Sequence, residues 1–203
     1  MIRILRGAAL LLGAFALTLT AQAQHFNPLS ADLGLTYNLE RAKLASVDCG
    51  CFWFQGGSFD AAVPLFRGLA AAATLIGNHK TDLTPGVDLS KIAFMAGPRY
   101  TLDIHRWTGH VLGVKHGLSI FGEGLFGSAH GFNAGFPDSS GTFSSENALS
   151  MQFGGGLNMG LARRLGVRAI EIDYVRTSFR NFASDSQSDL RLAFGVTYHV
   201  GGR

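Results

Sequence analysis

The chain has 203 residues, with 17 lysines and arginines against 14 acidic residues and a formal net charge of +3. Nucleic-acid binding needs basic residues concentrated on one face, and this sequence has no such concentration. With 27 glycines and 16 phenylalanines, the chain has few helix-forming stretches and many residues that favour strands and tight bends.

The first 23 residues are organised like a secretory signal peptide. Arg3 and Arg6 precede an apolar run over 8–19, and Ala21-Gln22-Ala23 supplies small residues at a cleavage site. An uncleaved N-terminal anchor is the alternative, but the run is shorter than the roughly 20 residues that a spanning helix needs. We therefore expect export, removal of residues 1–23, and one mature domain over 24–203.

Eight segments of the mature sequence alternate between large apolar and small or polar residues, which is the period of a β-strand. In chain order they span 31–41, 52–63, 69–78, 90–103, 118–128, 148–161, 167–177 and 188–200. Most reach or exceed the roughly 9 to 11 residues that a tilted membrane strand needs, whereas soluble strands usually have about 5 or 6.

The links between these segments mostly alternate in length. Long polar links cover 42–51, 79–89, 129–147 and 178–188, short ones cover 64–68 and 162–166, and the extended link 104–117 is an exception. Long links at one end and short turns at the other are typical of outer membrane barrels.

Charged residues lie in mid-strand, opposite the apolar face. They are Glu40, Lys91, Arg99, Glu123, Glu171, Asp173 and Arg191. In a soluble sandwich or lipocalin-like barrel, which is the alternative fold, these residues would face water. In a membrane barrel they would line a narrow interior, where unpaired charges are costly. We expect an all-β, eight-stranded antiparallel up-and-down transmembrane β-barrel with an interior network of ion pairs.

The sequence resembles the OmpA-like eight-stranded outer membrane β-barrel proteins, closest to the small barrel-only proteins of soil-type Gram-negative bacteria. The resemblance covers about residues 29–200 and is carried by CGCF at 49–52, GPRY at 97–100, GGGL at 154–157, IDY at 172–174 and the final strand. It implies insertion into the outer membrane by the assembly machinery that reads the last strand.

The two cysteines, Cys49 and Cys51, lie in the first long link, separated by one glycine. In an oxidising compartment they would either form a small, strained disulfide with each other, or remain as free thiols or thiols that pair with another molecule. A zinc site needs about four ligands, and neither these cysteines nor the histidines of 104–117 show a matching pattern. We expect no metal and no cofactor.

One enzymatic alternative remains open. Ser128 and His130 share one face of a strand, and Glu123 or Glu146 would orient the histidine for nucleophilic chemistry on lipid A. The alternative is that both residues simply begin the polar link at 129–147. We expect the chain not to be an enzyme.

The sequence thus predicts a monomeric integral outer membrane barrel that contacts outer membrane lipids and has a structural or surface-recognition role. A porin-like channel for small solutes is the main alternative, and the mid-strand charges argue against a wide one.

Overall fold

A computed structural model of the chain describes residues 30–43, 51–84, 87–104, 117–138, 141–179 and 186–201. Its strands are β1 (Ala31–Lys43), β2 (Cys51–Phe66), β3 (Leu69–Thr84), β4 (Val87–Asp103), β5 (Leu118–Asp138), β6 (Gly141–Gly160), β7 (Leu165–Thr177) and β8 (Gln187–Val200). Within these ranges no helix is long and apolar enough to cross a membrane. The signal peptide, Cys49 and the histidines of 105–116 lie outside the described residues.

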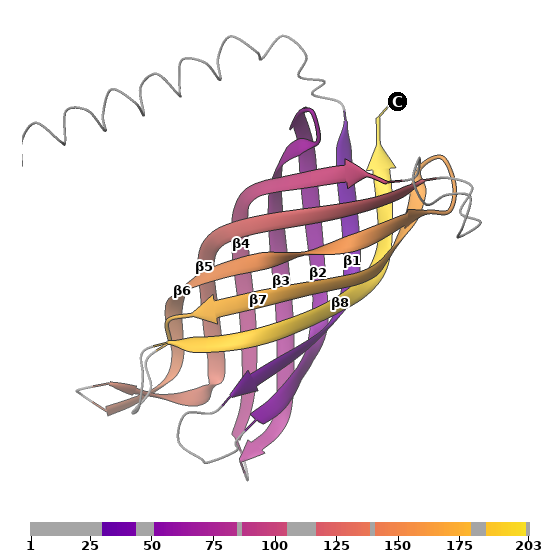
Figure 1. The fold of residues 1–203 in the computed structure, drawn as a ribbon. Helices are drawn as coiled ribbons and strands as arrows, with labels where there is room; N and C mark the ends of the chain where they lie inside the picture. The colour runs from indigo at the N-terminus through magenta and orange to yellow at the C-terminus, as the bar shows by residue number, and fades with distance from the viewer. Residues whose placement is uncertain are drawn as a thin grey trace, which may run out of the picture.

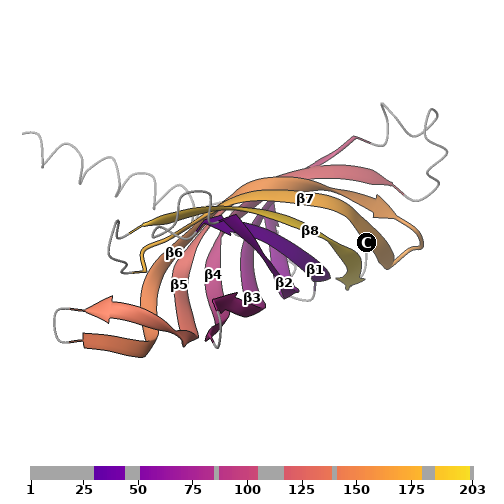
Figure 2. The same cartoon turned by 90° about the horizontal axis from the view of Figure 1, so that it is seen from below.

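Each strand pairs antiparallel with the next one, and β8 pairs with β1, so the sheet closes into a barrel. The closing pair sets Ala31 opposite Val200 and Arg41 opposite Leu190. Figure 2 shows β1 and β8 side by side. Closure leaves no sheet edge with unpaired backbone groups. The predicted eight-stranded antiparallel up-and-down barrel is confirmed.

The barrel has two distinct ends. We call the end where β1 begins and β8 finishes the terminal end, at the top of Figure 1, and the opposite end the loop end. At the terminal end a tight turn joins β2 to β3, and its residues Arg67 and Gly68 have positive φ values of 43° and 85°. Thr101 of the neighbouring β4 donates its backbone N–H to the carbonyl of Gly68 over 2.8 Å.

The predicted long link at 129–147 is wrong over most of its length. β5 continues to Asp138 and β6 begins at Gly141, and Phe136 pairs with Phe143. The resulting hairpin projects past its neighbours at the loop end, at the lower left of Figure 1. Its serine and glycine content resembles a loop, but backbone pairing between the two arms does not depend on side-chain type. A register shift between Phe132 and Phe136 separates the hairpin from the barrel wall.

A β-bulge interrupts β7 near its start. Leu157 pairs with Ile170 and Asn158 pairs with Arg168, so Ala169 has no partner on β6. Because one extra residue reverses the alternation of faces, Arg168 and Glu171 both face the interior. Strict alternation would have placed them on opposite faces.

Candidate functional site

The structure places all seven predicted charged residues on the inner face of the barrel, and each is buried. Three other charged side chains are buried with them, namely Asp60, Arg168 and Asp189. The buried set within the described residues therefore holds six carboxylates and four basic groups. These ten side chains form the central feature of the interior.

Toward the loop end, Lys91 and Glu40 form an ion pair across the interior. Asn78 donates from Nδ2 to Oε2 of the same glutamate over 2.6 Å, and Asp189 lies 3.8 Å from the lysine Nζ. The ammonium also lies 5.4 Å from the centroid of the Phe54 ring, within reach of a cation–π contact. The pair joins two strands that are not neighbours in the sheet, because Glu40 is on β1 and Lys91 is on β4.

At mid-height the guanidinium of Arg191 is surrounded by acceptors. It donates to Glu171, and its Nε and Nη2 lie 3.0 and 2.7 Å from Oδ2 of Asp173. Its Nη1 donates to Asn38 and Ser58, each over 3.2 Å. One side chain of β8 is thereby tied to β7, β1 and β2, which suits the rigid fork of an arginine.

Toward the terminal end, Asp60 of β2 holds two arginines. Its Oδ1 accepts from Nη1 of Arg99 over 2.7 Å, and its Oδ2 accepts from Nη1 of Arg168 over 2.9 Å. Arg99 also donates from Nε to Glu123 over 2.7 Å, and Arg168 donates to Glu171 over 2.6 Å. Both guanidinium carbons lie under 5 Å from the Phe121 ring, at 4.7 and 4.8 Å. The network is continuous from Asp60 to Arg191 through Glu171.

Two of the three buried charges that were not predicted have a signal in the sequence. Asp60 falls in the predicted strand at 52–63. Asp189 lies two residues before Arg191 in the final strand, so both side chains point to the same face. Arg168 had no such signal, because its inward position depends on the bulge at Ala169.

The glycine run of β6 makes room for this network. A Cβ on Gly154 would lie 2.1 Å from Oδ1 of Asp173 and 2.4 Å from the carbonyl oxygen of Ile172. Gly154 pairs with Glu123 on one side and with Asp173 on the other. The absent side chain therefore lets carboxylates from β5 and β7 approach each other across β6.

The interior is closed at mid-height. Arg191 is 1% exposed, and Gln152 and Asp173 are 0% exposed. Side chains lining a continuous aqueous channel would contact water, so the described residues leave no such channel at this level. At the loop end, Phe136 and Phe179 pack at 5.5 Å between ring centroids over the buried alanines of the barrel wall.

The outer face carries a band of large apolar side chains from all eight strands. Leu35 is 61% exposed and Phe94 is 56% exposed. Other members are Phe59, Leu75, Ile120, Phe126, Leu149, Phe153, Ile172, Tyr174, Leu190, Phe194, Val196 and Tyr198. Exposed apolar area of this extent is not a feature of monomers dissolved in water.

The enzymatic candidates lie on this outer face. Ser128 and His130 are exposed, and Nδ1 of His130 lies 2.8 Å from Oδ1 of Asn147. Glu123 faces the interior, where it binds Arg99. The prediction that Glu123 would orient His130 is therefore wrong, because residues of opposite parity face opposite sides of the wall. Cys51, the described member of the cysteine pair, is exposed at the start of β2.

Comparisons with known proteins bear on the fold. No protein-family model and no curated protein matches the sequence. The structure is similar to that of Ail, the attachment invasion locus protein of Yersinia pestis, with 15% identity, a TM-score of 0.52, and coverage of 84% of this chain and 97% of that one. It is also similar to Neisserial surface protein A, with 10% identity, a TM-score of 0.58, and coverage of 83% and 96%. The fold implied by the OmpA-like resemblance is confirmed.

Proposed function

We propose that the chain is an integral outer membrane β-barrel protein with a closed interior and a structural or surface-recognition role. The observation that carries this proposal is the arrangement of faces: apolar side chains outside and ion pairs inside. The hydrocarbon core of a membrane explains this arrangement, because it favours contact with apolar side chains. It also requires every backbone N–H and C=O group to pair within the protein. Export and insertion by the outer membrane assembly machinery belong to the same proposal, as does a monomeric state.

The membrane assignment is tested by one outward substitution. Phe94 lies midway along β4 and is 56% exposed, so Phe94→Lys would place a charge in the hydrocarbon. A lysine near the bilayer midplane costs about 2–4 kcal/mol. We expect the variant to fold poorly into lipid vesicles, measured by the heat-sensitive shift in gel mobility of a folded barrel.

The matched control is Ser144→Lys, an exposed position on the β5–β6 hairpin, which should fold like the unmodified protein. A soluble barrel would tolerate Phe94→Lys at least as well as Ser144→Lys. That result, or a purified mature protein whose gel mobility is the same with and without boiling, would refute the membrane assignment.

The closed interior argues against the porin-like alternative. Arg191, Glu171 and Asp173 are buried at mid-height and joined by direct ion pairs. We expect no reproducible channels in planar bilayers and no swelling of loaded liposomes. Stable open channels from the purified protein would establish the alternative instead.

A surface-recognition role is supported by the β5–β6 hairpin, which projects beyond the barrel and carries Phe143 at 52% exposure. Ail, which has a similar fold, is named the attachment invasion locus protein. We expect a Gram-negative host displaying the protein to adhere to cultured epithelial cells, and deletion of residues 133–146 to abolish adherence. The deletion variant must keep its heat-sensitive mobility, and equal adherence with and without the hairpin would contradict the role.

We further propose that the chain is not an enzyme. His130 is held by Asn147 and stacks on Phe132 at 5.8 Å, which suits a side chain of the outer wall. Mass spectrometry of lipid A from cells with and without the protein tests this, and we expect identical spectra. A new lipid A species that disappears in Ser128→Ala would reverse the conclusion.

A further inference from the structure

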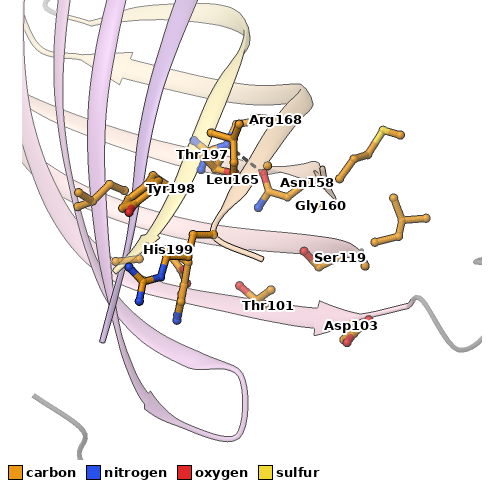
Figure 3. A pocket seen from close by; sticks show the side chains of 18 of the residues that line it. Thr101, Asp103, Ser119, Asn158, Gly160, Leu165, Arg168, Thr197, Tyr198 and His199 are labelled. Atoms are coloured by element: carbon orange, nitrogen blue, oxygen red, sulfur yellow. Dashed lines mark hydrogen bonds and ion pairs between the residues drawn. The ribbon is translucent and has the colours of Figure 1, made fainter. Parts of the chain in front are cut away.

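The interior contains a cavity of about 260 Å³ at the terminal end (Figure 3). Its walls come from all eight strands together with the turn between β6 and β7. It lies on the terminal side of the ion-pair network, whose Arg99 and Arg168 form its floor. Drug-sized ligands usually occupy about 300–1,000 Å³, so this cavity suits one small chemical group.

Two arginines stand at the mouth of the cavity without ion-pair partners among the described residues. Arg163 and Arg164 occupy the β6–β7 turn, and both line the cavity and are exposed. Of the two carboxylates in the lining, Asp32 lies 2.7 Å from Nδ1 of His199, and Asp103 is engaged in an interaction of its own. The mouth therefore presents two guanidinium groups that form no ion pair with a described carboxylate.

The floor of the cavity adds hydrogen-bond donors that make no hydrogen bond within the ion-pair network. Arg99 donates from Nε and Nη1, which leaves its Nη2 with no partner among the described residues. Asn158 accepts from Nε of Arg168 over 3.2 Å through its oxygen, so its amide nitrogen stays available. Figure 3 shows Asn158, Ser119 and Thr101 around the same space. Donors thus converge from the mouth and the floor.

We propose that this cavity binds a phosphate-type oxyanion group. Guanidinium groups match the geometry of phosphate oxygens and form charge-assisted hydrogen bonds with them, and neutral amide and hydroxyl donors complete the set. The volume admits a phosphate or a small phosphate ester. The ligand is either a free phosphate species or a phospholipid head group, since both present the same chemistry.

The test uses the purified, folded mature protein in a zwitterionic detergent without phosphate groups, with inorganic phosphate as the probe. Binding is followed by NMR chemical shifts of the backbone amides of Gly160 and Gly166, which line the cavity. We expect saturable shifts with phosphate that chloride at equal ionic strength does not produce. Shifts that never saturate, or equal shifts with chloride, would overturn the proposal.

Two variants locate the site. Arg163→Gln with Arg164→Gln should weaken phosphate binding at least about tenfold, because each lost charge-assisted hydrogen bond exceeds the 1.4 kcal/mol that a factor of ten represents. The control pair, Arg67→Gln with Arg41→Gln, removes the same charge from exposed positions outside the cavity lining. The control should bind phosphate as the unmodified protein does. An equal loss of phosphate binding in both pairs would mean that net charge, and not the cavity, causes the effect.

Ser119→Phe fills the cavity while leaving every arginine in place. We expect it to lose binding while keeping its heat-sensitive mobility, and normal binding by a folded Ser119→Phe variant would place the anion elsewhere. Titration with glycerol phosphate, and separately with micelles of the same phosphate-free detergent containing phosphatidylglycerol, distinguishes the two sources of phosphate. Competition against bound inorganic phosphate by one of them identifies that source, and competition by neither restricts the ligand to inorganic phosphate.

Discussion

The two ends of the barrel interior differ, because side chains close the loop end and leave a cavity at the terminal end, although the same eight strands form the wall at both. At the loop end, Phe136 and Phe179 pack over small residues and exclude water. At the terminal end, small lining residues such as Ala62 and Ala70 leave the cavity open beneath Arg163 and Arg164. Between them lies the ion-pair network. Strand number sets the bore of a barrel, but side-chain size decides where that bore is filled.

The largest expected effect tests the central network that separates the two ends. Arg191→Met leaves Asp173 buried without a basic partner among the described residues and leaves Glu171 paired with Arg168 alone. Removing one partner of a buried ion pair costs about 3–5 kcal/mol. We expect that loss in the free energy of unfolding, measured by urea titration of the protein in lipid vesicles.

Asp173→Asn is the matched comparison at the same site. It removes one of the six buried carboxylates, where only four basic groups balance them, and keeps an oxygen that accepts from Arg191. We expect a loss of no more than about 1 kcal/mol, the net value of one hydrogen bond. If both variants lose the same amount, the charge imbalance has no bearing on stability.

A smaller effect is expected at the loop end, where no charge is left unpaired. Phe136→Ala removes an aromatic ring that packs on Phe179 and above Gly131. Its loss should cost about 1.5–3 kcal/mol, the value of burying one large apolar side chain. The same urea titration measures it, with Phe143→Ala, an exposed ring of the same hairpin, as the control.

Phe136→Ala also separates the two barriers. Because the ion pairs at mid-height remain, the variant should form no conducting channels in planar bilayers. Channels in Phe136→Ala would show that the aromatic pair, and not the charged layer, closes the barrel.

The smallest stability effect belongs to the terminal end. Arg163→Gln with Arg164→Gln alters two exposed side chains that make no described ion pair, so the free energy of unfolding should change by less than about 0.5 kcal/mol per substitution. Thermal or urea unfolding without phosphate measures this. A large loss would mean that these arginines support the fold and would leave no separate binding role for them.

Much of the fold was predictable because strand periodicity is local. Glu40 and Arg191 could be placed inside by counting alternate residues from their apolar neighbours. Arg168 could not be placed, because the bulge at Ala169 reverses the alternation and has no marker in composition. The β5–β6 hairpin was not predicted because its composition is typical of a loop. Its strand structure comes from backbone pairing between β5 and β6, which composition does not show.

The sequence by itself determined the number of strands and which face of each is apolar, because successive side chains of a strand point to opposite sides. Only the tertiary structure decided which charges meet. Asp60 and Arg168 are 108 positions apart, and closure of the barrel together with its register brings them within hydrogen-bonding distance. The cavity at the terminal end is likewise a property of the closed barrel, because its walls come from all eight strands and these meet around one space only once the sheet is closed.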